Sequence, residues 1–315
     1  ASMAAMSPTG TLVYQPADAQ GVLGWVDMHG AFTPLIAQPQ AYAYPRISPD
    51  GKRVVVSIGS PGQNDVWVYD IASATLTRLT TGGAQNDRPE WTPDSRRVLF
   101  RSDRGASTAI WWQPADLSAP ATPLIEGNGH YYEAVVTPDD RNLVYQVDDA
   151  GADQADIMYR ALQGDTTSHP IAASHFVEAQ ARVSPDGKWV AYVTDASGTS
   201  QVVVQPFPGP GGVVQVSVGG GTEPVWSRDG HRLFYRDGHN VVAATVSTSG
   251  GFAVTGRTDV IPDHYVFATA PHANYDVSPD GTRLLVIRGT VTPEYDVVYG
   301  FGTELRARMH ARAGM

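Results

Sequence analysis

The chain contains no cysteine among its 315 residues. Disulfide bonds, thiolate metal ligands and a cysteine nucleophile are therefore excluded, although the compartment is not decided. No apolar run approaches the roughly 18 residues that a membrane-spanning helix needs, so no membrane span is predicted. The net charge of −10 argues against binding to nucleic acid, because that function requires a basic surface.

The two ends of the chain carry little information. No signal peptide is recognised at the start, where Ala1-Ser2-Met3 looks like a cloning remnant that can hide a native upstream segment. The tail over residues 303–315 is basic. It is predicted to be a short solvated helix or a frayed end rather than a segment that binds a partner.

What the sequence does contain is a four-residue turn motif in six copies. The copies begin 44, 45, 47, 43 and 51 residues apart, at Ser48, Thr92, Thr137, Ser184, Ser227 and Ser278. Five of the six have Pro at the second position, which presets φ, and all have Asp at the third, which can bond back to the backbone. An apolar run such as Val54-Val55-Val56 follows each copy. The motif therefore predicts a tight hairpin turn between two strands.

A period of about 40–50 residues filled with short strands is typical of a β-propeller. Because one blade cannot bury its own faces, the repeat predicts one closed ring over residues 1–315. We expect an all-β, six-bladed propeller with four antiparallel strands in each blade. The N- and C-terminal strands are expected to share one blade and so close the ring. Seven blades is the alternative, because Ser7-Pro8-Thr9-Gly10 could be a further copy.

Four strings resemble TolB-like, WD-type bacterial propellers: RISPDGKRVVVS from Arg46, NDVWVYDIASATLTRLT from Asn64, TEPVWSRDGHRLFYR from Thr222 and NYDVSPDG from Asn274. The nearest resemblance is to the propellers of bacterial eukaryote-type serine/threonine kinases. It implies a propeller fold and suggests a periplasmic or extracytoplasmic location. It does not imply kinase activity, because the sequence has no kinase motif. Since propellers host many activities, the resemblance is weak evidence for function.

The strand before each turn alternates in character. Polar or aromatic residues stand four positions before the Ser or Thr, and we call them the minus-four set: Tyr44, Arg88, Glu133, Gln180, Glu223 and Asn274. The minus-two set stands two positions before it and includes the charged residues Arg46, Glu90, Arg182 and Asp276. Because this strand lines the axis of a propeller, both sets are expected to ring the channel.

This ring suggests two kinds of cation site. Glu133, Gln180 and Asn274, together with Glu223, offer the oxygen ligands that Ca²⁺ prefers. His130, His175 and His272 lie just upstream of three of these strands, and imidazole suits Zn or Mn. If the three rings converge on the axis, they would hold a divalent metal at the channel mouth. The alternatives are arginine–carboxylate pairs in a polar tube and ordinary surface histidines.

A metal at that mouth would lower the pKa of bound water, with Glu178 or Glu223 as general base. The function predicted on this basis is a metal-dependent hydrolase of small-molecule esters, lactones or phosphate triesters. The alternative is a non-catalytic sensing or protein-interaction propeller with a protein partner, as the kinase-linked relatives suggest. In either case the turn aspartates, such as Asp50, are expected to be structural and to lie on the face opposite the mouth.

Overall fold

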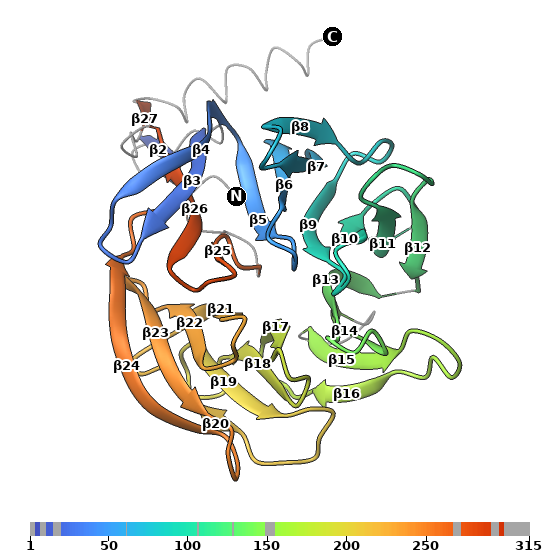
Figure 1. Cartoon of the computed structure of the whole chain (residues 1–315), viewed down its shortest axis with the longest axis vertical. Helices are drawn as coiled ribbons and strands as arrows, with labels where there is room; N and C mark the ends of the chain where they lie inside the picture. Colours follow the sequence, from blue (N-terminus) through green and yellow to red (C-terminus); the bar gives the residue numbers. More distant parts are fainter. Residues whose placement is uncertain are drawn as a thin grey trace.

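The protein is described here by a computed structural model that covers residues 4–6, 11–14, 20–60, 62–105, 107–127, 129–148, 155–266, 272–290 and 296–298. Over this part of the chain, all repeating secondary structure is β-strand. Six four-stranded antiparallel sheets stand around one axis like blades (Figure 1). The predicted six-bladed propeller is confirmed. No helix in these ranges has the length and apolarity that a membrane span requires.

Five blades follow one another along the chain, and each runs from the axis outward. Blade 1 is β5 (Tyr42–Ile47), β6 (Arg53–Ser60), β7 (Gln63–Asp70) and β8 (Thr75–Arg78). Blade 2 is β9 (Asn86–Trp91), β10 (Arg97–Ser102), β11 (Ala109–Pro114) and β12 (Thr122–Ile125). Blade 3 is β13 (His130–Val136), β14 (Asn142–Asp148), β15 (Asp156–Ala161) and β16 (His169–Ala172). Blade 4 is β17 (Glu178–Val183), β18 (Trp189–Thr194), β19 (Gln201–Pro206) and β20 (Val214–Gln215). Blade 5 is β21 (Thr222–Trp226), β22 (Arg232–Arg236), β23 (Asn240–Ser247) and β24 (Ala253–Pro262).

Blade 6 joins the two ends of the chain. Its inner strands are β25 (Asp276–Val277) and β26 (Arg283–Gly289), and its outer strands are β3 (Gly21–Asp27) and β4 (Phe32–Gln40). In the antiparallel register of β26 with β3, Leu285 lies opposite Trp25. The predicted closure of the ring by terminal strands is confirmed. The motif of the possible seventh copy, residues 7–10, lies outside the described residues. The strands on either side of it belong to no blade, because β1 (Ala4–Met6), β2 (Leu12–Tyr14) and β27 (Asp296–Val298) make a separate three-stranded sheet.

The apolar core lies between neighbouring blades. On β6, Val54 and Val56 pack with Leu285 of blade 6. Val55, between them, packs with Phe100 of blade 2. Successive side chains of a strand point to opposite faces, and here both faces are buried, which is why the sequence shows a continuous apolar run after each turn.

The six turns have the geometry that the motif predicts. In every copy the Ser or Thr hydroxyl donates to the Asp carboxylate at 2.5–2.6 Å. The same hydroxyl accepts the amide five residues later, as Ser48 does from Arg53 N at 2.9 Å. The fourth residue is left-handed in every copy, with φ between 58° and 72°, although it is Gly in only four of them. Ser95 and Asp140 take this conformation in the other two.

Candidate functional site

The inner strand of each blade lines the propeller axis, and in four blades its backbone is bulged at the minus-four position. φ is 58° at Tyr44, 52° at Arg88, 60° at Gln180 and 56° at Glu223. The strand register slips at the same four places. None of these residues is glycine, and left-handed backbone is costly for other residues. The surrounding contacts must therefore hold the bulges in place.

Those contacts form a relay from blade to blade. Gln180 Oε1 accepts a hydrogen bond from Glu223 N at 2.7 Å. Glu223 Oε2 accepts one from Asn274 N at 2.6 Å. Asn274 Oδ1 accepts one from Tyr44 N at 2.7 Å, which carries the relay into blade 1. Three residues predicted as cation ligands or bases thus satisfy backbone amides that would otherwise be buried without a partner.

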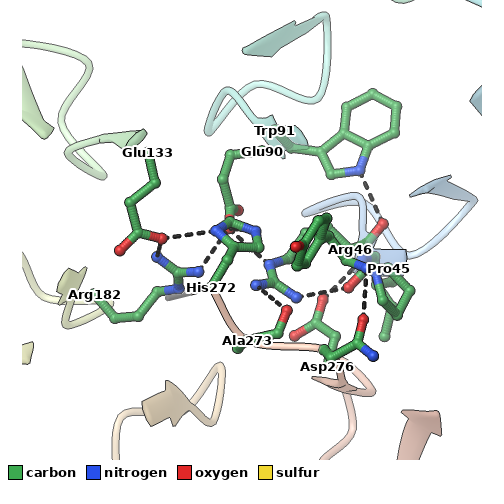
Figure 2. A network of polar contacts seen from close by, with 12 residues as sticks. Pro45, Arg46, Glu90, Trp91, Glu133, Arg182, His272, Ala273 and Asp276 are labelled. Atoms are coloured by element: carbon green, nitrogen blue, oxygen red, sulfur yellow. Dashed lines mark hydrogen bonds and ion pairs between the residues drawn. The ribbon is translucent and has the colours of Figure 1, made fainter. Parts of the chain in front are cut away.

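His272 fills the centre of the ring, where acidic and basic side chains from several blades meet (Figure 2). Its side chain is fully buried, and its Nδ1 lies 2.7 Å from Glu133 Oε2. Arg182 Nη1 donates to the same carboxylate oxygen at 3.2 Å. Glu90 Oε1 lies 2.7 Å from Arg46 Nε and 3.0 Å from Arg182 Nη2. The centre of the channel is therefore packed with paired charges, as the arginine–carboxylate alternative predicted.

Burial dominates the electrostatics of this centre. It lowers the pKa of His272 well below its ordinary value, and the positive charges of Arg46, Arg182 and Arg88 act in the same direction. Burial raises the pKa of Glu133, against the opposing effect of Arg182 and Arg88. The direction of both pKa shifts favours the uncharged forms of the imidazole and the carboxyl group. A neutral imidazole carries one donor and one acceptor nitrogen, so its Nδ1 can share one hydrogen with Glu133 Oε2.

Beside this centre, a funnel-shaped pocket of about 390 Å³ opens on the face that carries the turns. All six blades contribute to it. Its walls include the prolines of four turns, Pro49, Pro93, Pro138 and Pro185, and its remaining lining residues are Arg46, Ile47, Glu90, Trp91, Val135, Val136, Arg182, Val183, Val225, Trp226, Arg228 and Asp276. The pocket therefore contains the whole minus-two set and no member of the minus-four set.

The polar groups on the floor of the funnel are already engaged. Asp276 accepts hydrogen bonds from Ile47 N at 2.7 Å and Val277 N at 2.8 Å. The indole N–H groups of Trp91 and Trp226 donate to the carbonyls of Arg46 and Arg182 in the preceding blades, at 3.1 and 3.0 Å. The only side-chain N–H of each of these two tryptophans is thus in use, and their rings contribute apolar surface to the walls.

The structure does not bring the three predicted histidines together. His130 is exposed at the start of β13, with Nδ1 3.3 Å from Thr108 Oγ1. His175 is exposed and packs on the Phe176 ring at 4.0 Å between centroids, whereas His272 is buried. Among the described residues no group of three or more His, Asp or Glu side chains is placed to hold a metal ion. The predicted convergence is wrong because similar spacing before a turn does not give the three side chains the same orientation.

The two predicted general bases are also occupied. Glu178 is buried and accepts a hydrogen bond from Ser174 Oγ at 2.5 Å. Glu223 lies 3.4 Å from Arg236 Nε. Burial raises the pKa of both carboxyl groups. Their catalytic role stays a prediction, and their contacts are those of structural carboxylates.

The funnel was not predicted from the sequence. The predicted mouth was placed on the face opposite the turns and stays a prediction, whereas the funnel opens among the turn prolines. The available signal was the motif itself: five prolines and one arginine, Arg228, recur at equivalent positions around a ring. Side chains that recur in this way must lie around a common axis, although the sequence does not say that they leave a hollow between them.

Fold and site together describe a six-bladed propeller whose channel is filled at the centre and open at the turn face. The TolB β-propeller domain model matches residues 33–169, and the lipoprotein LpqB β-propeller domain model matches residues 158–299. The two matches together extend from residue 33 to residue 299, so the chain is similar to TolB-like and LpqB-like β-propeller domains over most of its length. The tail at 303–315 lies outside the described residues.

Individual relatives are distant. Over 166 residues, 52% of this chain and 38% of the relative, the sequence is 26% identical to the Tol-Pal system protein TolB of Francisella tularensis subsp. mediasiatica. An uncharacterised protein of Agrobacterium fabrum is 39% identical over 64 residues, which are 20% of this chain and 22% of that protein. The aligned segments thus span well under half of these curated relatives.

The solved structures described next show the fold alone, because each is less than 25% identical to this chain. A structure described as TolB from Agrobacterium tumefaciens has a TM-score of 0.65 at 15% identity, covering 87% of this chain and 99% of that one. TolB from Acinetobacter baumannii has a TM-score of 0.61 at 19% identity, with 79% and 65% covered. The hydrazine synthase of Kuenenia stuttgartiensis, an enzyme, has a TM-score of 0.58 at 15% identity, with 94% covered in each. Similarity of fold therefore does not distinguish a binding protein from an enzyme.

Proposed function

We propose that the protein is a non-catalytic interaction propeller that holds a segment of a partner protein in the funnel on its turn face. The observation that carries this proposal is the funnel itself, which is lined by all six blades and is rimmed by turn residues rather than by catalytic groups. Its volume of about 390 Å³ lies within the usual range for ligand pockets and fits a few side chains.

The chemistry of the funnel supports binding over catalysis. A general acid or base must come within hydrogen-bond reach of its substrate. His272 and Glu133, whose pKa values are shifted, are buried below the floor and do not line the funnel. Glu90, which does line it, is paired with Arg46 and Arg182. The name of the Francisella relatives, a Tol-Pal system protein, also refers to a system of proteins.

The test is site-specific crosslinking in the producing cell. A photoreactive amino acid replaces Pro185 at the rim of the funnel, and a control protein carries it at Val218, which is 67% exposed and does not line the funnel. We expect a discrete protein to be crosslinked only from the rim. Adding Pro138→Trp, which fills the funnel from an exposed rim position, should abolish that crosslink, whereas Val218→Trp should not. Equal crosslinking from both sites, or a rim crosslink that survives Pro138→Trp, would count against the proposal.

A further inference from the structure

The fifth turn departs from the repeat at the rim of the funnel. Arg228 stands where the other five copies have proline. Proline presets the backbone of such a turn, so arginine gives up rigidity at this position. Its side chain reaches from blade 5 to blade 1, where Nη2 donates to Ile47 O at 3.0 Å and Ser48 O at 3.4 Å. Since blade 6 stands between these two blades, the guanidinium group bridges the rim above it.

The other two cations of the funnel are committed to the protein. Arg46 donates to Glu90 and to the carbonyls of Pro45, Tyr275 and Ala273. Arg182 donates to Glu133 and to its neighbour's carbonyl, and it also lies 3.0 Å from Glu90. Both side chains are buried.

Arg228 differs in exposure and in partners. It is exposed, and no carboxylate among the described residues lies within 4.0 Å of its guanidinium nitrogens. Its hydrogen bonds go to two neutral carbonyl groups from a single nitrogen. A guanidinium group has five N–H donors, and its hydrogen bonds to a carboxylate are about twice as strong as those between neutral groups. An incoming carboxylate would therefore displace or supplement the carbonyl contacts.

The charge of the funnel points the same way. Three arginines and two carboxylates line it, an excess of one positive charge, in a chain whose net charge is −10. An acidic group would meet attraction here and repulsion over most of the remaining surface. Trp91, Trp226 and the turn prolines add apolar surface to the walls around Arg228, the one arginine of the funnel that is not paired with a carboxylate within the described residues.

We propose that Arg228 receives the carboxylate of an Asp or Glu side chain from the partner segment, while apolar neighbours of that residue pack against the funnel walls. This inference rests on the proposed function and names the chemistry of the partner. Arg228 is then the residue that determines specificity. A propeller with proline at this position would have the same funnel without the receptor for an acid.

The test uses peptides selected on the protein. A phage-displayed library of random 12-residue peptides is selected against the wild-type propeller. The affinity of an enriched peptide, and of its variant with the acidic residue changed to the amide, is then measured for the wild type, R228P and R228K. R228P restores the residue of the other five turns, so its melting temperature should not fall. R228K keeps the charge and loses the planar fork.

We expect enriched peptides to share one Asp or Glu, and R228P to weaken binding by about tenfold to a hundredfold, the effect of one charged hydrogen-bonded pair. The amide variant of the peptide should bind the wild type more weakly than the acidic peptide does, by the same factor. On R228P the two peptides should have nearly equal affinities. The affinity of R228K for the acidic peptide should lie between those of the wild type and R228P. Peptides without a shared acidic residue, or with equal affinity for R228P, would overturn this inference. If Pro138→Trp in the propeller still abolishes the binding of such peptides, the proposed function stands. If no peptide is enriched, or if Pro138→Trp does not block binding, the proposed function fails and this inference fails with it.

Discussion

Two rings of side chains lie only two residues apart along the same strands, yet only one of them borders the open funnel. All members of the minus-four set are at least 90% buried, and four of them bond to the backbone of the next blade. The minus-two set lines the open funnel. Both rings contain charged residues in the sequence, although the minus-two set also includes Val135 and Val225. The difference teaches that polar channel residues can bond to the protein in both rings, and that depth along the axis decides which ring also borders an open pocket.

The largest expected effect comes from the centre of the deep ring. Glu133→Ala removes the acceptor of Arg182 Nη1 and the partner of His272, so the buried Arg182 keeps only Glu90, which it shares with Arg46. Such changes cost about 3–5 kcal/mol in free energy of unfolding. Val135→Ala, two residues later in β13 and facing the funnel, should cost about 1 kcal/mol or less. Urea unfolding measures both. Equal costs would show that the two rings do not differ in the way described.

The relay between blades should contribute less per bond. Gln180→Ala leaves the buried Glu223 N–H without its acceptor, which costs about 1–3 kcal/mol. Gln215→Ala serves as the control, because this exposed glutamine of β20 bonds only within its own segment, to Ser217 O. Its effect should stay below about 0.5 kcal/mol. A cost for Gln180→Ala as small as that of the control would mean that the bulged strands are held by other contacts.

The turn face should show an acid-sensitive contribution. Hydrogen bonds from Ser278 and Thr282 lower the pKa of Asp280 from 3.8 to about 2. A carboxyl group whose pKa is lowered on folding stabilises the fold above its unfolded pKa and loses this contribution as the pH falls. Asp280→Ala should therefore cost about 0.5–1.5 kcal/mol at pH 6. The gap between the two proteins should narrow between about pH 4 and pH 2, as measured by urea unfolding. If the difference in free energy of unfolding between the two proteins is the same at about pH 4 and about pH 2, the ionised carboxylate of Asp280 is not its source.

The smallest effect is expected outside both rings. His130→Ala and His175→Ala change exposed side chains, so each should alter stability by less than about 0.5 kcal/mol. Chelator treatment should leave the melting temperature unchanged, because no described group of ligands awaits a metal. Elemental analysis of untagged protein and assays with ester, lactone and phosphate triester substrates complete the test. Bound Zn, Mn or Ca that is lost in either variant, together with hydrolysis, would revive the hydrolase prediction.

The fold could be predicted from the sequence because the turn motif repeats. Its period gave the blades, the apolar runs gave the buried second strands, and the absence of a good seventh copy favoured six. The bulges could not be predicted. Tyr44, Arg88 and Glu223 have left-handed backbone although none of them is glycine, so the sequence does not indicate this conformation. Hydrogen bonds between residues far apart in the chain hold these positions.

The site was harder to predict for a related reason. His130 and His272 both stand shortly before an inner strand, but His130 begins β13 at the surface and His272 turns into the axis. The number of residues between each histidine and its turn does not determine in which direction the side chain points. The volume of the funnel depends on the size of the side chains around the axis, which can be read from the sequence. It also depends on the distance between those side chains, which is defined only when the ring is closed.

The shared sixth blade has a consequence for how the chain acquires its structure. Blades 1 to 5 are each contiguous in sequence and can form in the order of synthesis. β3 and β4, made early, have to wait for β26, which is among the last strands of the ring to emerge. Until then, β3 presents an unpaired edge, and such edges are prone to pair with other chains. We therefore expect the final docking of β26 to be the slow step of folding, with a dependence on chaperones that a circular permutant with blade 6 made contiguous would lose.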